Sequence, residues 1–542
     1  MSNSAGSVPD QDAALAPLRQ AVAARPDDAA AQFALGTALW PAGQREESVQ
    51  HLTRAIALDP SHIDARNNLG NALLELGRFD EAIAQYRAAL ALRPNAVELH
   101  YNLGNALLTS ERPVEAEPCY RAALTLKPDH AGAHNNLGNV LRSQGKHAEA
   151  IAEYQAALTL RPEFYGSLNN IGSALLALHR PDEAVPYFEA ALRARPDYAE
   201  ASNNLGGALL ALDQPEQALE WFRRAVEQDS SQIQARFGEA MALLAMGNFR
   251  DGWVAYEARW LDPRFREDTP EFTDKPWLGQ ESVADRTVYL HVEQGLGDTI
   301  QFVRFAPLLR ARGARVVLEV QRPLVPLMQE LADVVIAQGD AVPPYDFRCP
   351  LLSLPLAFGT ELSTIPADIP YLRAAPARRA AWAARLGKRT RLRVGVAWSG
   401  APEHPEDAIR SIPAALFLPP LVAADVELHA IQKEIRENDA AAVAATTSLT
   451  VHADRLTDFA ETAALISELD LVISADTSVA HLAGALGVPT WILVQFSADF
   501  RWMRKRTDSP WYPTVRLFRQ AERNAWPPVI AEVVAALARQ KN

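Results

Sequence analysis

Three segments in the second half of the chain carry residue types that could bind a phosphate or move a proton, and the first is EQGLGDT at residues 293–299. Gly295 and Gly297 allow a tight backbone turn between an apolar run and a helix-like segment, and Asp298 falls where that helix begins. An aspartate in this place is a preferred helix cap without chemistry. The functional alternative is a carboxylate directed into a cleft, where it can act as a general base.

The second segment, AWSGAPEHPEDAIRSIP at residues 397–413, combines small polar residues with a cation. Ser399 and Gly400 can offer a hydroxyl and a free backbone amide to a phosphate. Arg410 can bind a diphosphate through two parallel hydrogen bonds. A polar loop with an incidental arginine is the alternative interpretation. Lys433 follows the next apolar run and is a weaker phosphate candidate.

The third segment, DLVISADTSVAHLAGALGVPTWIL at residues 470–493, reads as a buried strand, a short loop, a helix and another strand. Asp476, Thr477 and Ser478 fall at the carboxyl end of the strand and the N-terminus of the helix. Exposed amides and the helix dipole favour an anion there, which suits a pyrophosphate. His481 is either an ordinary helix residue or a side chain that points toward the same phosphates.

Short apolar runs must supply the strands that position these segments. The runs are TVYLHV, RVVLEV, ADVVIA, RVGVAW, VELHAI, DLVISA and PTWILV. Helix-like segments separate them, a pattern typical of parallel sheets with crossover helices. An Arg- and Ala-rich stretch around residues 375–391 divides the runs into two groups. The sequence therefore predicts an α/β region of two doubly wound, Rossmann-like lobes, with ligands bound at the carboxyl ends of the strands.

The GDT loop after the first strand, taken with the run DTSVAHLAGALGVPT, resembles the heptosyltransferase family, glycosyltransferase family 9. The resemblance extends over roughly residues 285–520 and implies a GT-B fold. It implies that Asp298 is the catalytic base. It also implies that Asp476, Thr477 and His481 bind the diphosphate of a nucleotide-sugar.

The chain departs from that family at two of the matching positions. Ser478 stands where the family has a glycine, and Arg410 of RSIP stands where the family has a lysine. The charge is retained at Arg410 but its geometry is not. Typical heptosyltransferases also lack the repeats of the first half. ADP-heptose is therefore not assumed as the donor.

The first half repeats one motif with a step of 34 residues, which is the length of a tetratricopeptide (TPR) repeat. The glycine of the motif recurs at Gly36, Gly70, Gly104, Gly138, Gly172 and Gly206. Small residues permit close helix approach, Gly77 breaks the chain between two helices and Pro94 ends the second. Because no unit can bury its own apolar face, the units must stack into an α-solenoid, a TPR superhelix with a concave groove.

An asparagine also recurs at the repeat period, one residue before the Leu/Ile-Gly pair. The asparagines are Asn68, Asn102, Asn136, Asn170 and Asn204. They either belong to common TPR sequences and solvate a helix face, or form a ladder whose amides bind the backbone of an extended peptide. The second arrangement resembles the TPR superhelix of O-GlcNAc transferases, which implies a protein or peptide partner in the groove.

Composition and charge exclude several other classes of protein. The formal net charge of −13 argues against a nucleic-acid partner, which needs a basic face. No apolar run reaches the roughly 18 residues of a membrane span, and MSNSAGSVPDQDAALAPLRQ lacks the pattern of a secretory signal, so we expect a cytoplasmic protein. Two distant cysteines, Cys119 and Cys349, predict neither a disulfide framework nor a zinc site.

The sequence thus predicts a TPR superhelix fused to a metal-independent, inverting glycosyltransferase that needs no cofactor besides its nucleotide-sugar co-substrate. We expect the TPR groove to recruit the acceptor, a protein; a lipid-linked or free glycan is the alternative acceptor. The alternative function is a protein-interaction scaffold with an inactive transferase-like domain. The predicted boundaries are 10–263 for about seven repeats with caps, 264–285 for a linker, 286–375 for the acceptor lobe, 391–520 for the nucleotide-sugar lobe and 521–542 for a C-terminal helix.

Overall fold

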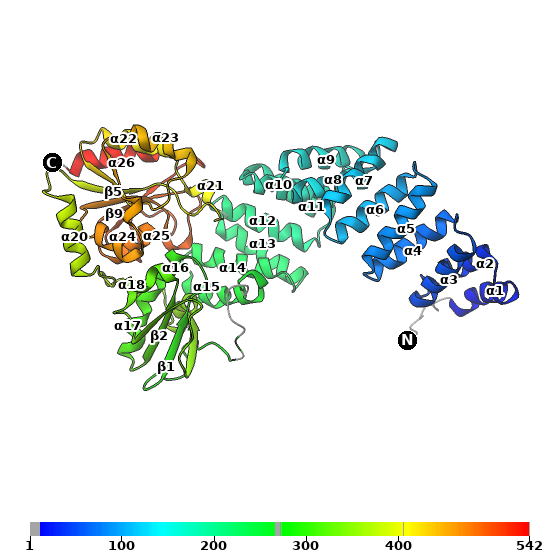
Figure 1. Ribbon diagram of the computed structural model, residues 1–542, viewed down its shortest axis with the longest axis horizontal. Coiled ribbons are helices and arrows are strands. Elements are labelled where there is room, and N and C mark those ends of the chain that lie inside the picture. The colour runs from blue at the N-terminus through cyan, green and yellow to red at the C-terminus, as the bar shows by residue number, and fades with distance from the viewer. Residues whose placement is uncertain (1–10, 266–271, 273, 405, 541–542) are drawn as a thin grey trace, which may run out of the picture. The chain divides into compact units, whose positions relative to one another are not determined.

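The computed structural model describes residues 11–265, 272, 274–404 and 406–540. The chain divides into two compact units, residues 1–205 and 206–542. The first unit is a solenoid of paired helices, and the second joins the last helix pairs to an α/β region (Figure 1). The predicted linker at 264–285 therefore lies inside the second unit, and its residues 266–271 and 273 lie outside the described residues.

The helix pairs follow the 34-residue period predicted from the sequence. The first helices of the pairs are α2 (Ala29–Leu39), α4 (Ile63–Glu75), α6 (Val97–Thr109), α8 (Ala131–Ser143), α10 (Tyr165–Ala177), α12 (Ala199–Ala211) and α14 (Ile233–Ala245). The second helices are α3 (Arg45–Leu58), α5 (Phe79–Leu92), α7 (Pro113–Leu126), α9 (His147–Leu160), α11 (Pro181–Ala194), α13 (Pro215–Gln228) and α15 (Phe249–Tyr256). Helix α1 (Gln11–Ala24) precedes them.

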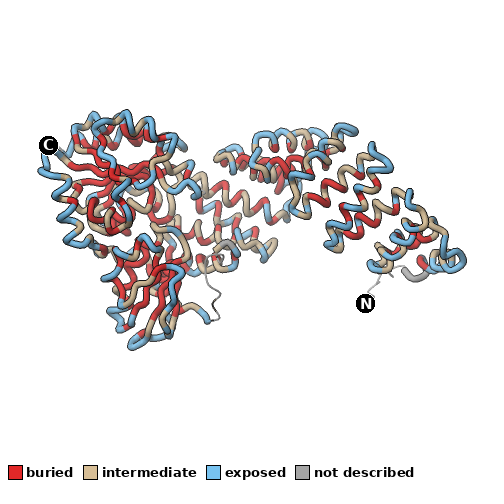
Figure 2. Tube along the Cα trace, viewed as in Figure 1, coloured by how far each residue is buried: buried red, intermediate tan, exposed pale blue. Residues whose placement is uncertain are grey.

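Small residues bring the two helices of each pair into close contact. A Cβ atom at Gly70 would lie 2.7 Å from the Tyr86 ring, and one at Gly138 would lie 2.5 Å from the Tyr154 ring. Both tyrosines are fully buried. Figure 2 shows buried residues along these helices, and the short Cβ distances confirm the close approach predicted from the glycines.

The turn inside each pair places one residue in the left-handed conformation, and these residues also recur every 34 positions. They are Gly43, Gly77, Glu111, Gly145, His179, Asp213 and Gly247, with φ between 56° and 79°. A left-handed residue just past a helix exposes its N–H to the last carbonyls and ends the helix. Glycine adopts this conformation without strain, whereas Glu111 and His179 do not.

The α/β region contains two parallel sheets. The first has the strand order β3-β2-β1-β4, and the second has the order β10-β9-β8-β5-β6-β7. The strands are β1 (Thr287–His291), β2 (Arg315–Val320), β3 (Val334–Ala337), β4 (Phe347–Pro350), β5 (Arg393–Ala397), β6 (Glu427–Ala430), β7 (Leu449–Val451), β8 (Leu471–Ala475), β9 (Thr490–Val494) and β10 (Val515–Arg519). Each apolar run named above forms a strand; β4, β7 and β10 were not predicted.

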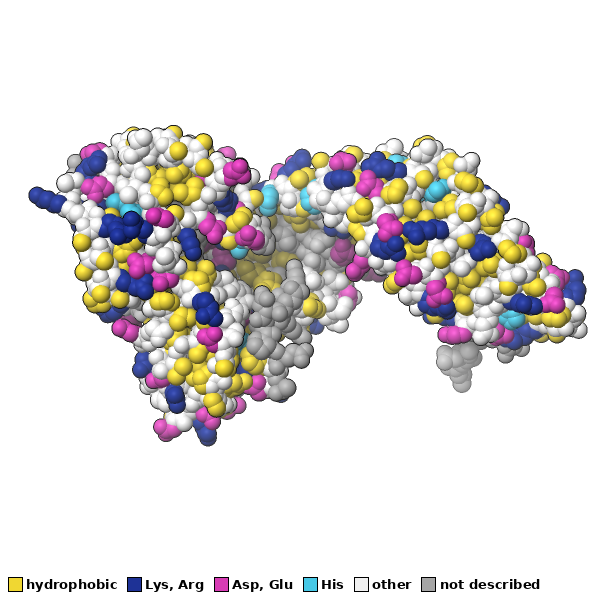
Figure 3. All heavy atoms as spheres, in the orientation of Figure 1, with side chains coloured by type: hydrophobic (Ala, Val, Ile, Leu, Met, Phe, Trp, Pro, Cys, Tyr) yellow, Lys and Arg dark blue, Asp and Glu magenta, His cyan; other side chains and the backbone are white. Residues whose placement is uncertain are grey.

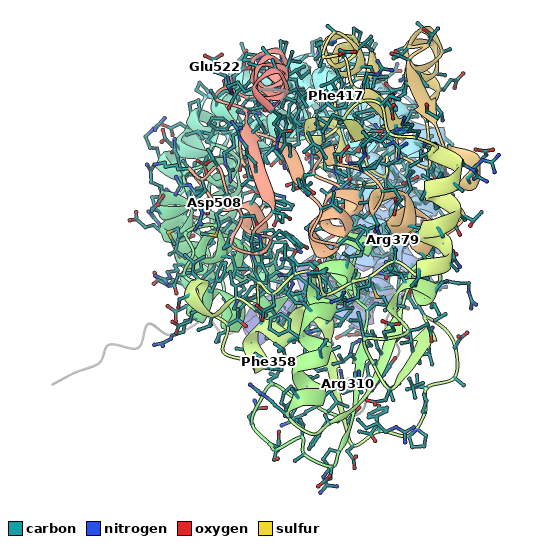
Figure 4. All side chains as sticks on the ribbon, turned by 90° about the vertical axis from the view of Figure 1, so that its left-hand side faces the viewer. Arg310, Phe358, Arg379, Phe417, Asp508 and Glu522 are labelled. Carbon is teal, nitrogen blue, oxygen red and sulfur yellow. The ribbon has the colours of Figure 1, made fainter. Side chains whose placement is uncertain are left out.

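Helices cover both sheets. They are α16 (Leu296–Phe302), α17 (Ala306–Ala311), α18 (Val325–Met328), α19 (Leu354–Ala357), α20 (Pro376–Leu386), α21 (Asp407–Arg410), α22 (Ala414–Val422), α23 (Glu437–Ala445), α24 (Phe459–Ile466), α25 (Ser478–Ala485) and α26 (Trp526–Gln540). In Figure 4, Arg310 marks α17 beside the first sheet, and Phe417 and Arg379 mark α22 and α20 beside the second. The Arg- and Ala-rich stretch 375–391 thus contains helix α20.

Charged side chains of both signs are interspersed over the face drawn in Figure 3. Among the described residues, no helix is long and apolar enough to span a bilayer.

The strained turn at Glu111 gives a prediction. Replacing Glu111 with glycine relieves a left-handed strain of about 1–2 kcal/mol and adds about 0.5–1 kcal/mol of backbone entropy cost. We expect Glu111→Gly to raise the free energy of unfolding by about 0.5–1 kcal/mol, measured as a higher urea midpoint. Gly145→Ala, at the same turn of the next repeat, should lower the midpoint. A lower midpoint for Glu111→Gly would contradict the assigned turn geometry.

Candidate functional site

The second sheet changes direction between β5 and β8. From β5 the chain adds β6 and β7 on one side, then returns to add β8, β9 and β10 on the other. The loops that leave β5 and β8 therefore diverge and open a crevice at the carboxyl ends of these strands, which is where parallel α/β sheets bind ligands. The predicted segments 397–413 and 470–493 supply these two loops.

A cavity of about 230 Å³ lies at this crevice and includes the GDT loop of the first sheet. It is lined by Gly295, Leu296, Gly297, Asp298, Gly400, Ala401, His404, Glu406, Arg410, Asp476, Thr477, Ser478, His481, Asp499 and Arg501. The structure thus brings together the chemical residues of all three segments. Ser399 and Lys433 are the predicted residues that do not line the cavity.

The N-termini of α16 and α25 meet in this cavity. Gly297, in the first turn of α16, is the point of contact, because a Cβ atom there would lie 3.0 Å from the His481 ring and 3.6 Å from the Ser478 backbone. Thr477 caps α25 with extended backbone, so the first N–H groups of that helix face the cavity without helical acceptors. The two loops therefore present helix N-termini to one small space.

Asp298 caps its helix, as one interpretation of the sequence predicted, and it also lines the cavity. Its Oδ2 accepts a hydrogen bond from the Gly295 N–H at 3.0 Å, so the carboxylate caps its own helix. Its Oδ1 accepts a short hydrogen bond from the Arg501 guanidinium. Its side chain is 19% exposed and lines the cavity. The capping bond fixes the carboxylate while leaving Oδ1 directed at a partner that a ligand can displace.

Arg501 was not predicted from the sequence. It follows β9 in the short 3-10 helix Phe500–Trp502, and its guanidinium also donates to Asp499 at 2.8 Å. Burial alone would lower the pKa of Arg501, but the carboxylates of Asp499 and Asp298 raise it, so the group is a permanent cation. The sequence feature that could have identified Arg501 is the pair Asp499 and Arg501, which follows the carboxyl end of a predicted strand.

Arg410 is the second cation of the cavity. Its charge acts on the Glu406 and Asp476 carboxyls, whose pKa values it lowers, but in the described part of the chain no carboxylate forms a close ion pair with it. A Cβ atom at Gly400 would lie 2.7 Å from the Arg410 guanidinium, so only glycine lets that group lie against the backbone. The Nε atom of Arg410 is buried without a hydrogen-bond partner among the described residues. An unpaired guanidinium beside two helix N-termini favours an anion.

Burial favours the uncharged forms of both Asp476 and His481. Burial and the nearby Asp499 raise the pKa of Asp476 to about 6. Burial and the guanidinium of Arg501 hold the pKa of His481 well below its usual value, so the imidazole is neutral. Its Nδ1 lies 2.9 Å from the Tyr512 hydroxyl. Its Nε2 lies 4.0 Å from Asp476 Oδ1, and with a neutral ring this is no ion pair.

Ser399 and Lys433 are placed differently from their prediction. The Ser399 hydroxyl accepts a hydrogen bond from Gln432 Nε2 at 2.7 Å, and the Ser399 N–H donates to Gln432 Oε1 at 3.0 Å. Ser399 is buried in a contact between two loops. Gln432 there forms hydrogen bonds with both its hydroxyl and its backbone N–H. Lys433 is exposed and is not among the residues that line the cavity. Neither contacts the cavity.

No group of three or more His, Cys, Asp or Glu side chains among the described residues is arranged to hold a metal ion. That the transfer needs no metal ion stays a prediction, and so does the absence of a cofactor.

The asparagines of the repeats form a chain of hydrogen bonds between neighbouring pairs of helices. Each donates its side-chain amide to the preceding repeat: Asn68 to Thr37 at 3.2 Å, Asn102 to Asn67 at 2.9 Å, Asn136 to Asn105 at 2.8 Å, Asn170 to Asn139 at 2.9 Å and Asn204 to Asn169 at 3.0 Å. All are half-buried. Their NH₂ groups thus stabilise repeat stacking. The side-chain oxygens of Asn136 and Asn204 also accept hydrogen bonds, from the neighbouring Asn135 and Asn203 at 3.0 and 3.3 Å.

Buried tyrosines extend this network. Tyr86, Tyr120 and Tyr154 donate their hydroxyls to Asn71, Asn105 and Asn139 at 2.6, 2.8 and 2.8 Å. Where the aromatic residue is Phe188 instead, the asparagine is replaced by Ser173. The asparagine is thus lost in the same repeat in which the aromatic residue loses the hydroxyl that would donate to it. A cavity of about 220 Å³ beside Asn68 is lined by Thr37, Trp40, Asn71 and Glu75, among others.

Comparison with known proteins agrees with both halves of this architecture. Residues 41–77 and 70–110 match the TPR repeat, residues 101–163 and 169–233 match the tetratricopeptide repeat, and residues 425–502 match glycosyltransferase family 9 (heptosyltransferase). The last match includes Asp476, His481 and Arg501 but not the loop of Asp298.

The protein FlbA of Caulobacter vibrioides is 30% identical over 338 residues, which cover 57% of this chain and 55% of FlbA. The chain thus spans about half the length of this curated relative.

Two solved structures are similar to part of the chain. MamA is 26% identical, with a TM-score of 0.29, over 31% of this chain and 97% of MamA. YrrB, described as a TPR protein with an unusual peptide-binding site, is 26% identical, with a TM-score of 0.30, over 34% of this chain and 95% of YrrB. From the family matches, the chain carries TPR repeats and, C-terminal to them, a glycosyltransferase family 9 domain.

Proposed function

We propose that the chain transfers a sugar from a nucleotide-sugar to a polypeptide held by its TPR repeats, and that its two parallel sheets are the lobes of a GT-B fold. One observation carries the proposal: Asp298, Arg410 and Asp476, from three separate loops, line one cavity at the switch point of the second sheet. An inactive scaffold has no need to keep such a convergence of charged groups. This favours the enzyme over the scaffold.

The donor diphosphate occupies the space between Arg410 and the N-terminus of α25. Arg410 supplies a cation that forms no close ion pair among the described residues, and Thr477 and Ser478 supply backbone N–H groups. The neutral His481 can donate from Nε2 when Nδ1 accepts from Tyr512. Asp476 and Asp499 would repel a phosphate when ionised, so they are better suited to accept hydrogen bonds from the hydroxyls of the sugar.

Arg501 connects donor binding to the base. In the described structure it is shared between Asp298 and Asp499. A diphosphate entering the cavity offers it a third anionic partner, and transfer of the guanidinium to that partner leaves Asp298 Oδ1 free.

Asp298 then accepts the proton of the acceptor hydroxyl while the oxygen attacks the anomeric carbon and the bond from that carbon to the phosphate oxygen breaks. Arg410 and the helix N–H groups stabilise the charge on the departing diphosphate. Direct displacement by a single base inverts the anomeric centre.

The base is tested by replacing Asp298 with asparagine, which keeps the shape of the side chain. Because a general base contributes about 10²–10⁴-fold to a rate, we expect Asp298→Asn to lower kcat at least about 100-fold. The Kd for the nucleotide, measured by calorimetry, should change only a few-fold. The donor is first identified by thermal shift with UDP-, GDP-, ADP- and CMP-sugars, because a ligand that binds the native state raises its stability. An equal loss of donor binding would make Asp298 a structural residue.

The raised pKa of Asp476 predicts that the negative charge of its carboxylate lowers the stability of the fold. The folded-state pKa, about 6, exceeds the unfolded value near 3.9, so ionisation of Asp476 destabilises the fold as pH rises from about 4 to 6. Asp476→Asn should therefore have a higher Tm than the wild type at pH 7.5 and an equal Tm below about pH 4. Inorganic pyrophosphate should bind the variant more tightly at pH 7.5, measured by calorimetry. A lower Tm at pH 7.5 would refute the charge assignment.

The role of the asparagine ladder is tested by replacing Asn102, Asn136 and Asn170 together with alanine. We expect transfer to polypeptide to fall relative to donor hydrolysis, because three acceptors of about 0.5–1.5 kcal/mol each are lost from the groove. These substitutions also remove hydrogen bonds between repeats, so a matched control is needed.

The chain offers that control in its buried tyrosines. Replacing Tyr86, Tyr120 and Tyr154 with phenylalanine weakens the same hydrogen-bond network from positions that are not exposed. Phe188 already occupies the equivalent position in the next repeat, so the ring fits. The tyrosine variant should lose stability and keep the wild-type ratio of transfer to hydrolysis. If the asparagine variant has the same ratio of transfer to hydrolysis as the tyrosine variant, the asparagines serve only to stack the repeats.

A further inference from the structure

The loop that carries Asp499 and Arg501 is held by TPR helices. In residues 495–506, Arg504 donates to the Asp213 carboxylate at 2.7 Å, to the Asp213 carbonyl at 2.7 Å and to Glu216 at 2.8 Å. Ser497 donates to the carbonyl of Leu210 at 2.9 Å. Leu210, Asp213 and Glu216 span the end of α12 and the start of α13, within the second unit. The two contacts bracket Arg501 in sequence.

The loop that carries Asp298 is held by the segment after the last TPR helix. Arg259, which is fully buried, donates to both carboxylate oxygens of Glu293 at 2.7 and 3.0 Å. The same guanidinium donates to Ser353 at 2.7 Å. Gln294 donates to the Tyr256 hydroxyl at 3.0 Å. Glu293 and Gln294 directly precede Gly295, whose N–H holds the Asp298 carboxylate.

A single TPR side chain also packs against aromatic residues of both loops. The ring of Trp253, on α15, is 6.1 Å from Phe302 at the end of α16 and 5.4 Å from Phe500 beside Arg501. Trp253 is 1% exposed and belongs to the same apolar core as Phe302, Phe500 and Trp511. The TPR pattern drifts in this segment of the sequence. The structure shows why: its side chains pack against the α/β region.

We propose that the TPR helices of the second unit, from the end of α12 to the segment after α15, are part of the catalytic machinery. Arg504 and Arg259 are the positioning residues that hold Arg501 and Asp298 in contact. The inference rests on the proposed function of the cavity. Its physical basis is that Arg501 and Asp298 lie on loops of different sheets, and both loops are anchored on the TPR side. Loosening one anchor shifts one partner relative to the other and changes the charge that faces an anion.

The test compares Arg504→Ala with Arg506→Ala. Arg506 lies two residues away on the same loop, and among the described residues its guanidinium pairs with the exposed Asp508 alone, so it is a matched control. We expect Arg504→Ala to increase deuterium exchange in residues 495–506 and also in residues 293–302. It should weaken binding of inorganic pyrophosphate about 3–10-fold in the full chain, measured by calorimetry. Arg506→Ala should change neither measurement.

Asp213→Asn provides a second variant that does not depend on the fold tolerating loss of Arg504. Asparagine accepts the left-handed conformation of this residue, whose φ is 57°, and removes only the charge. It should reproduce both effects at smaller size. Unchanged exchange in residues 293–302 in either variant would overturn the inference. Absence of pyrophosphate binding by the wild type would instead refute the proposed anion site, and exchange alone would then decide the role of the anchors.

Discussion

The contact between Arg501 and Asp298 is the point on which the candidate site depends, because it joins loops of two different sheets. Without it, Asp298 would remain a helix cap and Arg501 a partner of Asp499. With it, the cavity has a cation that can exchange one carboxylate for another anion. Buried ion pairs add little net stability, since desolvation offsets most of the attraction. Their value here is that they specify which groups face each other across the cavity.

The cavity concentrates charge at a cost in stability. Asp476 has its pKa raised to about 6 by burial and by Asp499, and the buried Nε of Arg410 has no hydrogen-bond partner in the part of the chain that the structure describes. Protein interiors normally satisfy such groups, and exceptions gather at functional sites. The repeats show the opposite rule. There the buried hydroxyls of Tyr86, Tyr120 and Tyr154 each have an asparagine acceptor, and the acceptor is absent where Phe188 replaces tyrosine.

The sequence predicts features that depend on local patterns and fails for those that depend on distant neighbours. The 34-residue period predicts the helix pairs, and apolar runs predict most strands. Strands β7 and β10 were missed because Leu449–Val451 is short and half exposed and Val515–Arg519 alternates with arginines. Three loops with Gly, Asp or Arg at strand ends predict most of the cavity. Arg501 was missed because its role comes from Asp298, 203 residues earlier in the chain.

The last TPR repeat illustrates why a departure from a repeat pattern is informative. A repeat in the middle of a solenoid contacts only its neighbours, so its sequence can follow the common pattern. A terminal repeat must cover its open face. Here the open face of the last repeat packs against the loops of the α/β region through Trp253 and Arg259, instead of facing solvent. Because the same loops carry Arg501 and Asp298, substitutions that improve the repeat pattern at these positions would remove contacts on which the cavity is built.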